Sequence, residues 1–383
     1  MIKDDKRIGR WQQHATRAFF FIGGFGVASW APLVPLLRER LGIGEDVLGM
    51  LLLCIGIGSL LTMPVAGAAA ARFGCRRIIL IASVLYACLL PVLCQISDVW
   101  LCALVLLCFG AVMGAVDIVV NVHAVVVEKA AKKPLMSGMH ALWSVGGFMG
   151  AGMFVLLLES GFTPLQSTLC AVMVMLILAA IFTPHLLQYC STRKSDAMFV
   201  MPKGIVFFVG IICFIAFLVE GAIMDWSGVF LTTVRGIEIS LAGTGFAVFS
   251  AAMLCIRLGG DWLIQRCGGK CVVLWGSCLT ICGFLLVMFT VSNYLLYIGF
   301  FLIGIGSANI VPIFFSLLGR QTVMPVNLAV SAVGTMGYLG ILLGPALIGF
   351  IAHQTSLIFS FALLTLLVIL QIFIAKLAYK KFI

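Results

Sequence analysis

Charged residues are scarce in this 383-residue sequence. They make up 10% of the chain, whereas hydrophobic residues make up 63%. A soluble globular domain carries about 25% charged residues, most of them on its surface. The composition therefore excludes that class and predicts a polytopic membrane protein along the whole chain.

Several features of other protein classes are also missing. No Walker-type glycine-rich loop is present, so we do not expect ATP to drive this protein directly. The 14 cysteines occur singly, without the spacing of a metal site or a disulfide framework, and we interpret them as small buried hydrophobic residues. Residues 1–17 are polar and basic, and no small-residue cleavage site follows them. We therefore expect the first apolar run to be a retained helix.

The net charge of +10 would suggest nucleic-acid binding in a soluble protein. Here the basic residues lie in short loops between apolar runs, where they orient helices in a membrane. With a cytoplasmic N-terminus, all but four of the 24 Lys and Arg residues fall on the cytoplasmic side. The exceptions are Arg38, Arg40, Arg235 and Arg257. The pattern predicts that both termini are cytoplasmic, and it implies no nucleic-acid partner.

Long apolar runs are what the sequence has in abundance. Twelve are long enough to cross the hydrocarbon of a bilayer as helices. They cover residues 17–37, 47–70, 76–95, 99–124, 137–158, 165–187, 204–231, 240–263, 270–291, 293–318, 328–350 and 355–377. The polar segment 188–203 separates six runs from six. We predict an all-α membrane protein with two six-helix halves, 1–187 and 204–383, joined by a cytoplasmic linker.

The run 204–231 contains two carboxylates, Glu220 and Asp225. Glu220 lies near its midpoint and therefore near the centre of the membrane. A carboxylate there costs about 2.5–3.5 kcal/mol, so such residues usually face a bundle interior or a wet cavity. Five residues correspond to about 140° around a helix, so the two acids cannot both point at one ligand. We expect different roles for them.

Small and polar residues form a stripe on the fourth run, at Gly110, Gly114, Asp117 and Asn121. They fall within about 60° of one another at 100° per residue. One interpretation is the wall of a polar cavity. The alternative is a tight helix contact through the glycines, with the acid satisfied by a neighbour.

The eighth run carries Arg257 and Asp261, four residues apart. This spacing permits a local ion pair, with the arginine reaching toward the membrane surface. The competing hypothesis is a gate in which Arg257 contacts an acid of the other half, such as Asp117.

Neutral polar groups lie in the tenth and eleventh runs, beside proline and several glycines that allow a helix to bend. Asn309 and Tyr338 could supply hydrogen bonds to a polar solute. Trp226 could stack on a sugar ring or belong to an interfacial aromatic belt.

Both halves carry a similar mark after their second run, which suggests an internal parallel repeat. Glycine permits a tight turn there, and the cations lie where helix C-termini present unpaired carbonyls. The first half has Gly67, Arg72, Gly74, Arg76 and Arg77, and the second has Gln265, Arg266, Gly268, Gly269 and Lys270.

These marks resemble the cytoplasmic loop motif of the major facilitator superfamily, and the resemblance covers the whole chain. Residues 256–266 are similar to the eighth-helix signature of fucose permease-like transporters. Asp117 and Asn121 are similar to that group's Glu-x-x-x-Asn, and residues 220–226 resemble an uncharacterised bacterial branch. The sequence departs from the motif at Ala71 and Gln265, where the family has an acid. The first-helix aspartate of fucose permease is absent from residues 27–32.

The resemblance implies a secondary transporter of a small, sugar-like solute in the bacterial inner membrane. We expect a midplane cavity between the halves, lined by Asp117, Asn121, Glu220 and Asn309. Asp117 and Glu220 are the candidates for proton coupling. The candidates for substrate binding are Asn121, Asp225, Trp226, Asn309 and Tyr338. The candidates for gating or structural roles are Gly67, Arg72, Gly74, Arg76, Arg77, Arg257, Asp261 and Arg266.

Two alternatives stay open. An exporter of amphiphilic compounds would keep the fold and reverse the direction. A membrane-embedded transferase would need a clustered histidine and acid site with larger loops, and the sequence shows neither. We expect no cofactor and no metal, a monomer, and lipid, protons and a small-molecule substrate as the partners.

Overall fold

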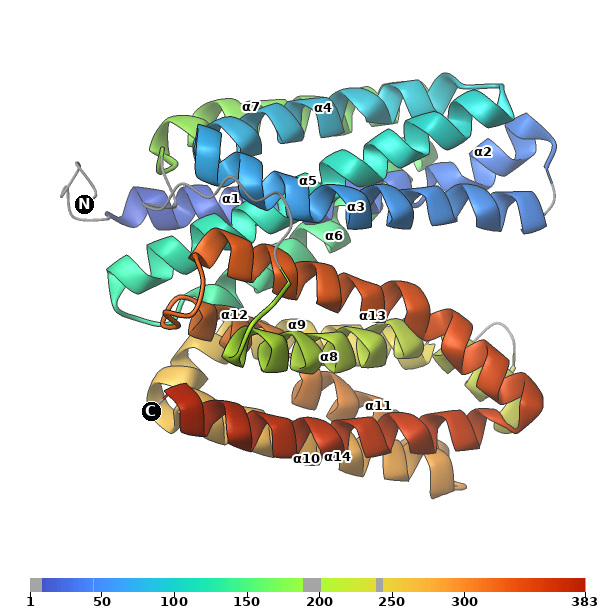
Figure 1. Ribbon diagram of the computed structural model, residues 1–383. Coiled ribbons are helices and arrows are strands. Elements are labelled where there is room, and N and C mark those ends of the chain that lie inside the picture. The colour runs from blue at the N-terminus through green and yellow to red at the C-terminus, as the bar shows by residue number, and fades with distance from the viewer. Residues whose placement is uncertain (1–8, 44, 189–200, 239–243, 383) are drawn as a thin grey trace. The chain divides into compact units, whose positions relative to one another are not determined.

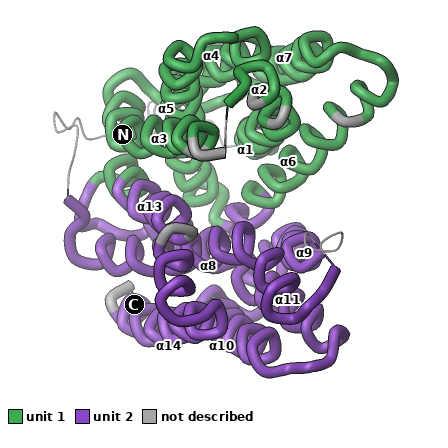
Figure 2. Tube along the Cα trace, turned by 90° about the vertical axis from the view of Figure 1, so that its right-hand side faces the viewer, with its two compact units in different colours: residues 1–132, 139–200, 325–331 green, residues 133–138, 201–324, 332–383 purple. Residues whose placement is uncertain are grey.

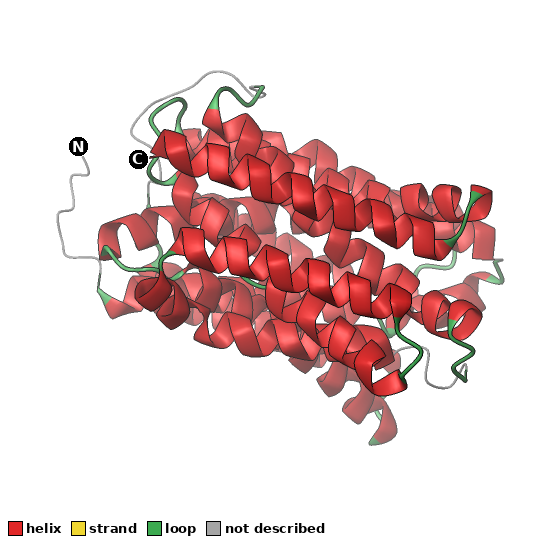
Figure 3. Ribbon diagram, turned by 90° about the horizontal axis from the view of Figure 1, so that it is seen from below, coloured by secondary structure: helices red, strands yellow, loops and turns green. Residues whose placement is uncertain are grey.

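The computed structural model describes residues 9–43, 45–188, 201–238 and 244–382 (Figure 1). Within these residues the chain is helical, short loops join the helices, and no strand is present (Figure 3). Eleven helices of the described part of the chain are long and apolar enough to cross a membrane. The all-α membrane architecture is therefore confirmed. The first described helix, Arg10–Trp30, is not among these eleven segments.

The chain forms two compact units (Figure 2). Unit 1 comprises residues 1–132, 139–200 and 325–331, and unit 2 comprises residues 133–138, 201–324 and 332–383. The units separate between residues 200 and 201, inside the predicted linker, of which residues 189–200 lie outside the described part of the chain. By its contacts, however, segment 133–138 belongs to unit 2 and segment 325–331 to unit 1. The sequence-based division did not include this exchange.

The helices of the first half are α1 (Arg10–Trp30), α2 (Leu33–Leu41), α3 (Glu45–Phe73), α4 (Cys75–Gln95), α5 (Val99–Ala131), α6 (Met136–Glu159) and α7 (Pro164–Phe182). Those of the second half are α8 (Ile205–Val229), α9 (Thr244–Cys267), α10 (Gly269–Phe289), α11 (Asn293–Ser307), α12 (Ile310–Leu318), α13 (Val326–Gln354) and α14 (Leu357–Phe382). A π-helical turn, Phe230–Val234, extends α8.

Two predicted runs are broken in the structure. The first, predicted as 17–37, starts earlier, at Arg10, and is interrupted between Trp30 and Leu33. The tenth, predicted as 293–318, is interrupted at Ala308 and Asn309. A proline lies at or just after each break, Pro32 and Pro312. Proline has no backbone N–H and cannot continue the hydrogen-bond ladder, which a count of apolar residues does not register.

Each unit packs its helices in the same pairs. In unit 1, α5 contacts α3 and α4, while α7 contacts α4 and α1. In unit 2, α11 contacts α9 and α10, while α14 contacts α10 and α8. These pairings correspond one to one along the chain, as a parallel internal repeat requires.

Glycine contacts show the register of the repeat. A Cβ atom added to Gly110 would overlap the carbonyl oxygen of Ile55, and one added to Gly304 would overlap that of Phe249. The interval in sequence from Gly110 to Gly304 equals the interval from Ile55 to Phe249, so the two contacts are equivalent. Close backbone approach at glycine is the usual way to pack helices in lipid, where no hydrophobic force drives them together.

The turns after α3 and α9 are also equivalent. Gly74 and Gly268, which are separated by the same repeat interval, have φ angles of 90° and 78°. Only glycine adopts such angles without strain. The predicted tight turns are therefore present, with glycine at the position that needs it.

Arg40 and Arg235, two of the exceptions to the charge pattern, have a structural explanation. Arg40 donates hydrogen bonds to the carbonyls of Leu93, Cys94 and Ile96 at the end of α4. Arg235 donates to the carbonyls of Val287 and Met288 at the end of α10. The last carbonyls of a helix have no intrahelical donors, so each arginine caps the helix formed by the third predicted apolar run of its half.

The interpretation of the cysteines as buried was wrong for most of them. Cys75 is buried but disulfide-bonded, and seven of the 12 free cysteines among the described residues are exposed. The exposed ones are Cys88, Cys108, Cys255, Cys267, Cys271, Cys278 and Cys282. On a membrane helix the exposed face meets lipid, which accepts a weakly polar thiol as readily as a protein core does.

Candidate functional site

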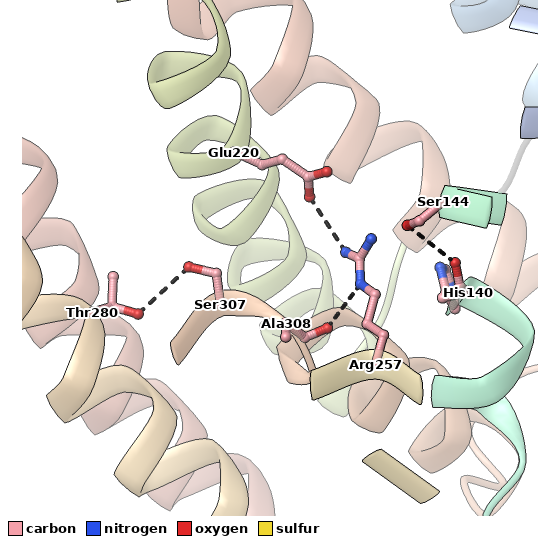
Figure 4. A network of polar contacts seen from close by, with 7 residues as sticks. All are labelled: His140, Ser144, Glu220, Arg257, Thr280, Ser307 and Ala308. Atoms are coloured by element: carbon pink, nitrogen blue, oxygen red, sulfur yellow. Dashed lines mark hydrogen bonds and ion pairs between the residues drawn. The ribbon is translucent and has the colours of Figure 1, made fainter. Parts of the chain in front are cut away.

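An ion pair lies at the polar centre of unit 2 (Figure 4). Glu220 of α8 points at Arg257 of α9, with 3.6 Å between Oε2 and Nη2. The Glu220 side chain is 28% exposed and that of Arg257 is 8% exposed. The arginine is therefore buried and does not extend to the membrane surface as predicted, because an acid on a neighbouring helix meets it inside the unit.

The break between α11 and α12 supplies the second contact of Arg257. Its Nε donates a hydrogen bond of 3.1 Å to the carbonyl oxygen of Ala308. In a regular helix the N–H of residue 312 would take this oxygen, but residue 312 is proline. Pro312 therefore leaves an acceptor that orients the guanidinium of Arg257.

A serine from the first half of the chain completes this centre. The Oγ of Ser137 lies 2.9 Å from the Arg257 carbonyl oxygen and 2.6 Å from Oδ1 of Asn309. A hydroxyl has one proton, so it donates to one of these oxygens at a time. Asn309 is 3% exposed, and its Nδ2 has no acceptor among the described residues. Ser137 thus connects the backbone of α9 to the break before α12.

Asp261 holds the start of α6. Its Oδ1 accepts from the amide of Ser137 and its Oδ2 from the amide of Gly138, each at 3.0 Å. The first amides of a helix lack intrahelical acceptors and carry partial positive charge, so a carboxylate there is stabilising. Asp261 therefore caps the segment 133–138, a role that the local pair predicted with Arg257 did not include.

In unit 1 the predicted polar stripe on α5 contains a local hydrogen-bonded pair. Nδ2 of Asn121 donates to Oδ1 of Asp117 at 3.0 Å and to the Asp117 carbonyl at 2.9 Å. Asn121 is 2% exposed, and its Oδ1 accepts no hydrogen bond from any described residue. Gly110 and Gly114 pack against α3. The alternative interpretation of the stripe therefore applies: its glycines make a tight helix contact, and its acid has a neighbour as partner. The cavity wall stays a prediction.

Three predicted binding residues lie away from the ion pair in sequence. Asp225 is exposed, more than one turn along α8 from Glu220. Trp226 is half-buried, and its ring covers Gly349 of α13. Tyr338 of α13 is half-buried. Their roles in binding stay predictions. So does a cavity joining Asp117 and Asn121 of unit 1 to Glu220 and Asn309 of unit 2.

The predicted loop marks take part in packing inside unit 1. The carbonyl of Gly67 accepts from Nδ2 of Asn327 at 3.2 Å, and the Met63 carbonyl accepts from Oγ of Ser331 at 2.7 Å. A Cβ atom on Gly67 would meet the Ser331 side chain. Gly67 is therefore small because segment 325–331 packs against it.

The basic residues of the marks lie on the surface of their units. The guanidinium of Arg72 lies over the Phe73 ring and that of Arg266 over the Trp262 ring, at 5.4 and 5.3 Å from the ring centres. Arg77 is exposed and Arg76 half-buried. Cations over aromatic faces at this distance are favourable, and none of these four is buried.

Sequence reasoning missed Ser137, Asn327 and Ser331. The internal repeat could have identified the two serines. Ser137 and Ser331 occupy equivalent positions of the two halves, and so do Met63 and Arg257, because the two pairs are separated by the same interval in sequence. Each serine bonds a carbonyl of the other half: Ser137 that of Arg257 in α9, and Ser331 that of Met63 in α3. Among the described residues, no group of three or more His, Cys, Asp or Glu side chains could hold a metal ion.

Comparison with known proteins agrees with this architecture. The sequence profile of the Major Facilitator Superfamily matches residues 18–195. An uncharacterized MFS-type transporter of Yersinia pestis is 46% identical over 358 residues, covering 94% of this chain and 93% of that protein.

Solved structures show the same fold at low sequence identity. The human organic anion transporter MFSD10 has a TM-score of 0.78 at 16% identity, covering 96% of this chain and 99% of that one. The Escherichia coli fucose:proton symporter FucP also has a TM-score of 0.78, at 14% identity, covering 96% and 98%. The fold, the duplicated halves and the close bacterial relative lead to one conclusion: this chain belongs to the major facilitator superfamily and is a multi-pass membrane transporter of a small molecule, not an enzyme.

Proposed function

We propose that this transporter moves a small polar solute by alternating access, coupled to protons, as a monomer in the bacterial inner membrane. The observation that carries the proposal is the Glu220–Arg257 pair in unit 2. Ionisable residues inside membrane helices are expensive and usually mark the path of a solute or proton. A glutamate can accept a proton, whereas an arginine in a protein cannot release one. Glu220 is therefore the member of the pair that would carry the proton.

Asp117 is the second candidate for proton coupling. It is half-buried on α5, and Asn121 is its hydrogen-bond partner. The Oδ1 of Asn121 is buried with no donor among the described residues, and leaving a buried polar atom unsatisfied is costly. A hydroxyl group of the solute would satisfy this oxygen. The pair thus supports a role in binding a hydroxylated solute as well as a proton.

The sugar-like character of the solute follows from resemblance. The segment Ile256–Arg266 is similar to the eighth-helix signature of fucose permease-like transporters, and FucP is a fucose:proton symporter. At 14% identity the structural likeness concerns the fold alone. Asn309, Tyr338 and Trp226 would provide the neutral hydrogen bonds and the aromatic face that a sugar ring requires.

The test separates exchange from accumulation. We expect Asp117→Asn or Glu220→Gln to keep substrate exchange across a liposome membrane and to lose accumulation driven by a pH gradient. The amide has the shape of the protonated acid but cannot release a proton. A screen for thermal stabilisation by sugars, nucleosides and organic acids identifies the substrate first. Counterflow and gradient-driven uptake are then measured on the same vesicles.

Glu238→Gln is the matched control, since Glu238 is an exposed acid in the loop after the π-helical turn. It should behave as the parent in both assays. If both membrane variants still concentrate the substrate, neither acid couples protons. If both lose binding, the two acids are ligand contacts and the coupling group lies elsewhere.

A further inference from the structure

Arg257 poses a problem of charge balance that Glu220 solves in this structure. Its side chain is 8% exposed, and a guanidinium stays protonated in a protein. A buried charge without a partner is strongly unfavourable inside a membrane helix bundle. Arg257 therefore needs an anion next to it at every stage of transport.

The geometry of the pair allows the anion to be exchanged. The 3.6 Å between Oε2 and Nη2 exceeds the 2.7–2.9 Å of a charge-assisted hydrogen bond, so the contact is electrostatic and not locked by a shared proton. Glu220 is 28% exposed and is the more accessible partner. The Nε bond to the Ala308 carbonyl meanwhile keeps the guanidinium in place.

The other charged groups among the described residues of unit 2 are bonded to backbone groups, lie on another face of α8, or lie near helix ends. Asp261, one turn from Arg257, has one backbone amide on each carboxylate oxygen. Asp225 is about 140° around α8 from Glu220. Among the helices packed against α8, α12 has no charged residue. The charged residues and the histidine of α13 and α14 lie within the last two turns of these helices: His353, Lys376, Lys380 and Lys381. Their tyrosines, Tyr338 and Tyr379, carry no charge near neutral pH.

We infer that the transported solute carries a carboxylate, which takes the place of Glu220 on Arg257 when Glu220 accepts a proton. This inference rests on the proposed proton coupling. Before binding, the pair consists of the guanidinium and the carboxylate of Glu220. Afterwards the guanidinium faces the neutral acid of Glu220 and the carboxylate of the solute, so the net charge around Arg257 is unchanged and one proton enters with each anion.

A neutral sugar cannot replace the charge of Glu220, whereas a carboxylate matches the planar guanidinium in charge and shape. The polar groups nearby favour a hydroxylated solute, since Asn309 Nδ2 lacks an acceptor among the described residues. The chemical class is therefore a small hydroxylated monocarboxylate, such as a sugar acid.

The test uses the purified full-length protein in detergent. Its thermal stability is measured with glycerate, gluconate, glucuronate and galactonate, each beside its neutral counterpart: glycerol, glucose or galactose. We expect stabilisation by carboxylates alone. The affinity for the carboxylate should be higher at pH 6 than at pH 8, because one proton binds with each anion.

Glu220→Gln keeps the acid position neutral, so the affinity of this variant for the carboxylate should be the same at pH 8 and at pH 6. If it does not fold, the neutral double variant Glu220→Gln/Arg257→Gln should fold and bind none of the carboxylates. Glu238→Gln should match the parent.

Two failures are distinguishable. Stabilisation by neutral sugars, or by none of the carboxylates at millimolar concentration, overturns the inference and leaves proton coupling standing if Glu220→Gln still abolishes accumulation. Carboxylate binding that is independent of pH in the parent overturns the proposed proton coupling, and the inference falls with it.

Discussion

At the scale of single residues, Arg257 organises the polar centre of unit 2. Its side chain meets Glu220 and the Ala308 carbonyl, and its own carbonyl faces Ser137. Three helices and a helix break thus converge on one arginine. A sequence pattern can show that Arg257 is unusual inside an apolar run, but not which of several acids it meets. The gate with Asp117 stays a prediction, because Asp117 belongs to unit 1.

Ser137 provides a test of this centre that does not touch a charge. Ser137→Ala removes the hydroxyl that contacts both the Arg257 carbonyl and Asn309, and it leaves buried polar atoms without that partner. We expect a loss of about 1–3 kcal/mol in the free energy of unfolding, measured by reversible unfolding in mixed micelles. Ser160→Ala is the control, since Ser160 is exposed and bonds the Leu156 carbonyl of the preceding helical turn. Equal effects of the two changes would contradict the role given to Ser137.

At the scale of helices, glycine positions decide how closely the elements approach. Gly304 faces the Phe249 carbonyl of α9, whereas Gly259 on α9 has open space around it. In the sequence both are simply small residues in a membrane helix. Only the packed structure shows that Gly304 has a close neighbour and Gly259 has none. The sequence also does not show which prolines accompany a helix break. Pro64 and Pro91 lie inside continuous helices, whereas Pro312 follows a break.

Alanine substitution should separate these glycines. Gly304→Ala is expected to destabilise the protein by about 1–3 kcal/mol, because the new methyl group overlaps a backbone oxygen that cannot move without shifting α9. Gly259→Ala should be neutral or stabilising by up to about 1 kcal/mol, since alanine favours the helix more than glycine does. Thermal denaturation of the two purified variants beside the parent decides the matter. A stable Gly304→Ala protein would mean that α9 and α11 are packed more loosely than described.

At the scale of the whole molecule, the distribution of Lys and Arg predicts cytoplasmic termini, and the structure explains two exceptions. Arg40 and Arg235 cap the ends of α4 and α10 inside their own units. An arginine that binds helix carbonyls is explained by its structural role. It therefore counts less against a cytoplasmic location of the termini than an unbound cation in an outer loop would.

Labelling of single cysteines tests this orientation. Lys133→Cys, after α5, should resist a membrane-impermeant thiol reagent in intact cells, while Ser97→Cys, between α4 and α5, should react; both positions are exposed. The background must lack the reactive native cysteines, since seven of those in the described residues are exposed. Permeabilised cells should label at both positions. The reverse pattern in intact cells would invert the predicted orientation.

The sequence by itself determined the class, the helices and the repeat. In lipid every backbone N–H and C=O must be satisfied within the protein, so an apolar run of sufficient length has to be a helix. For the same reason the family could be recognised from loop marks, because glycine turns and cationic helix ends depend on local chemistry. The run boundaries failed where a proline interrupted the backbone ladder.

Only the tertiary structure decided which polar groups meet. Glu220 and Arg257 come from different helices, and Ser137 reaches Asp261 across 124 residues of sequence. Each of these contacts depends on how the helices are rotated and on how closely they approach at small residues. Packing over the whole unit sets both. Local sequence shows that a charge inside the membrane needs a partner, and the fold selects the partner.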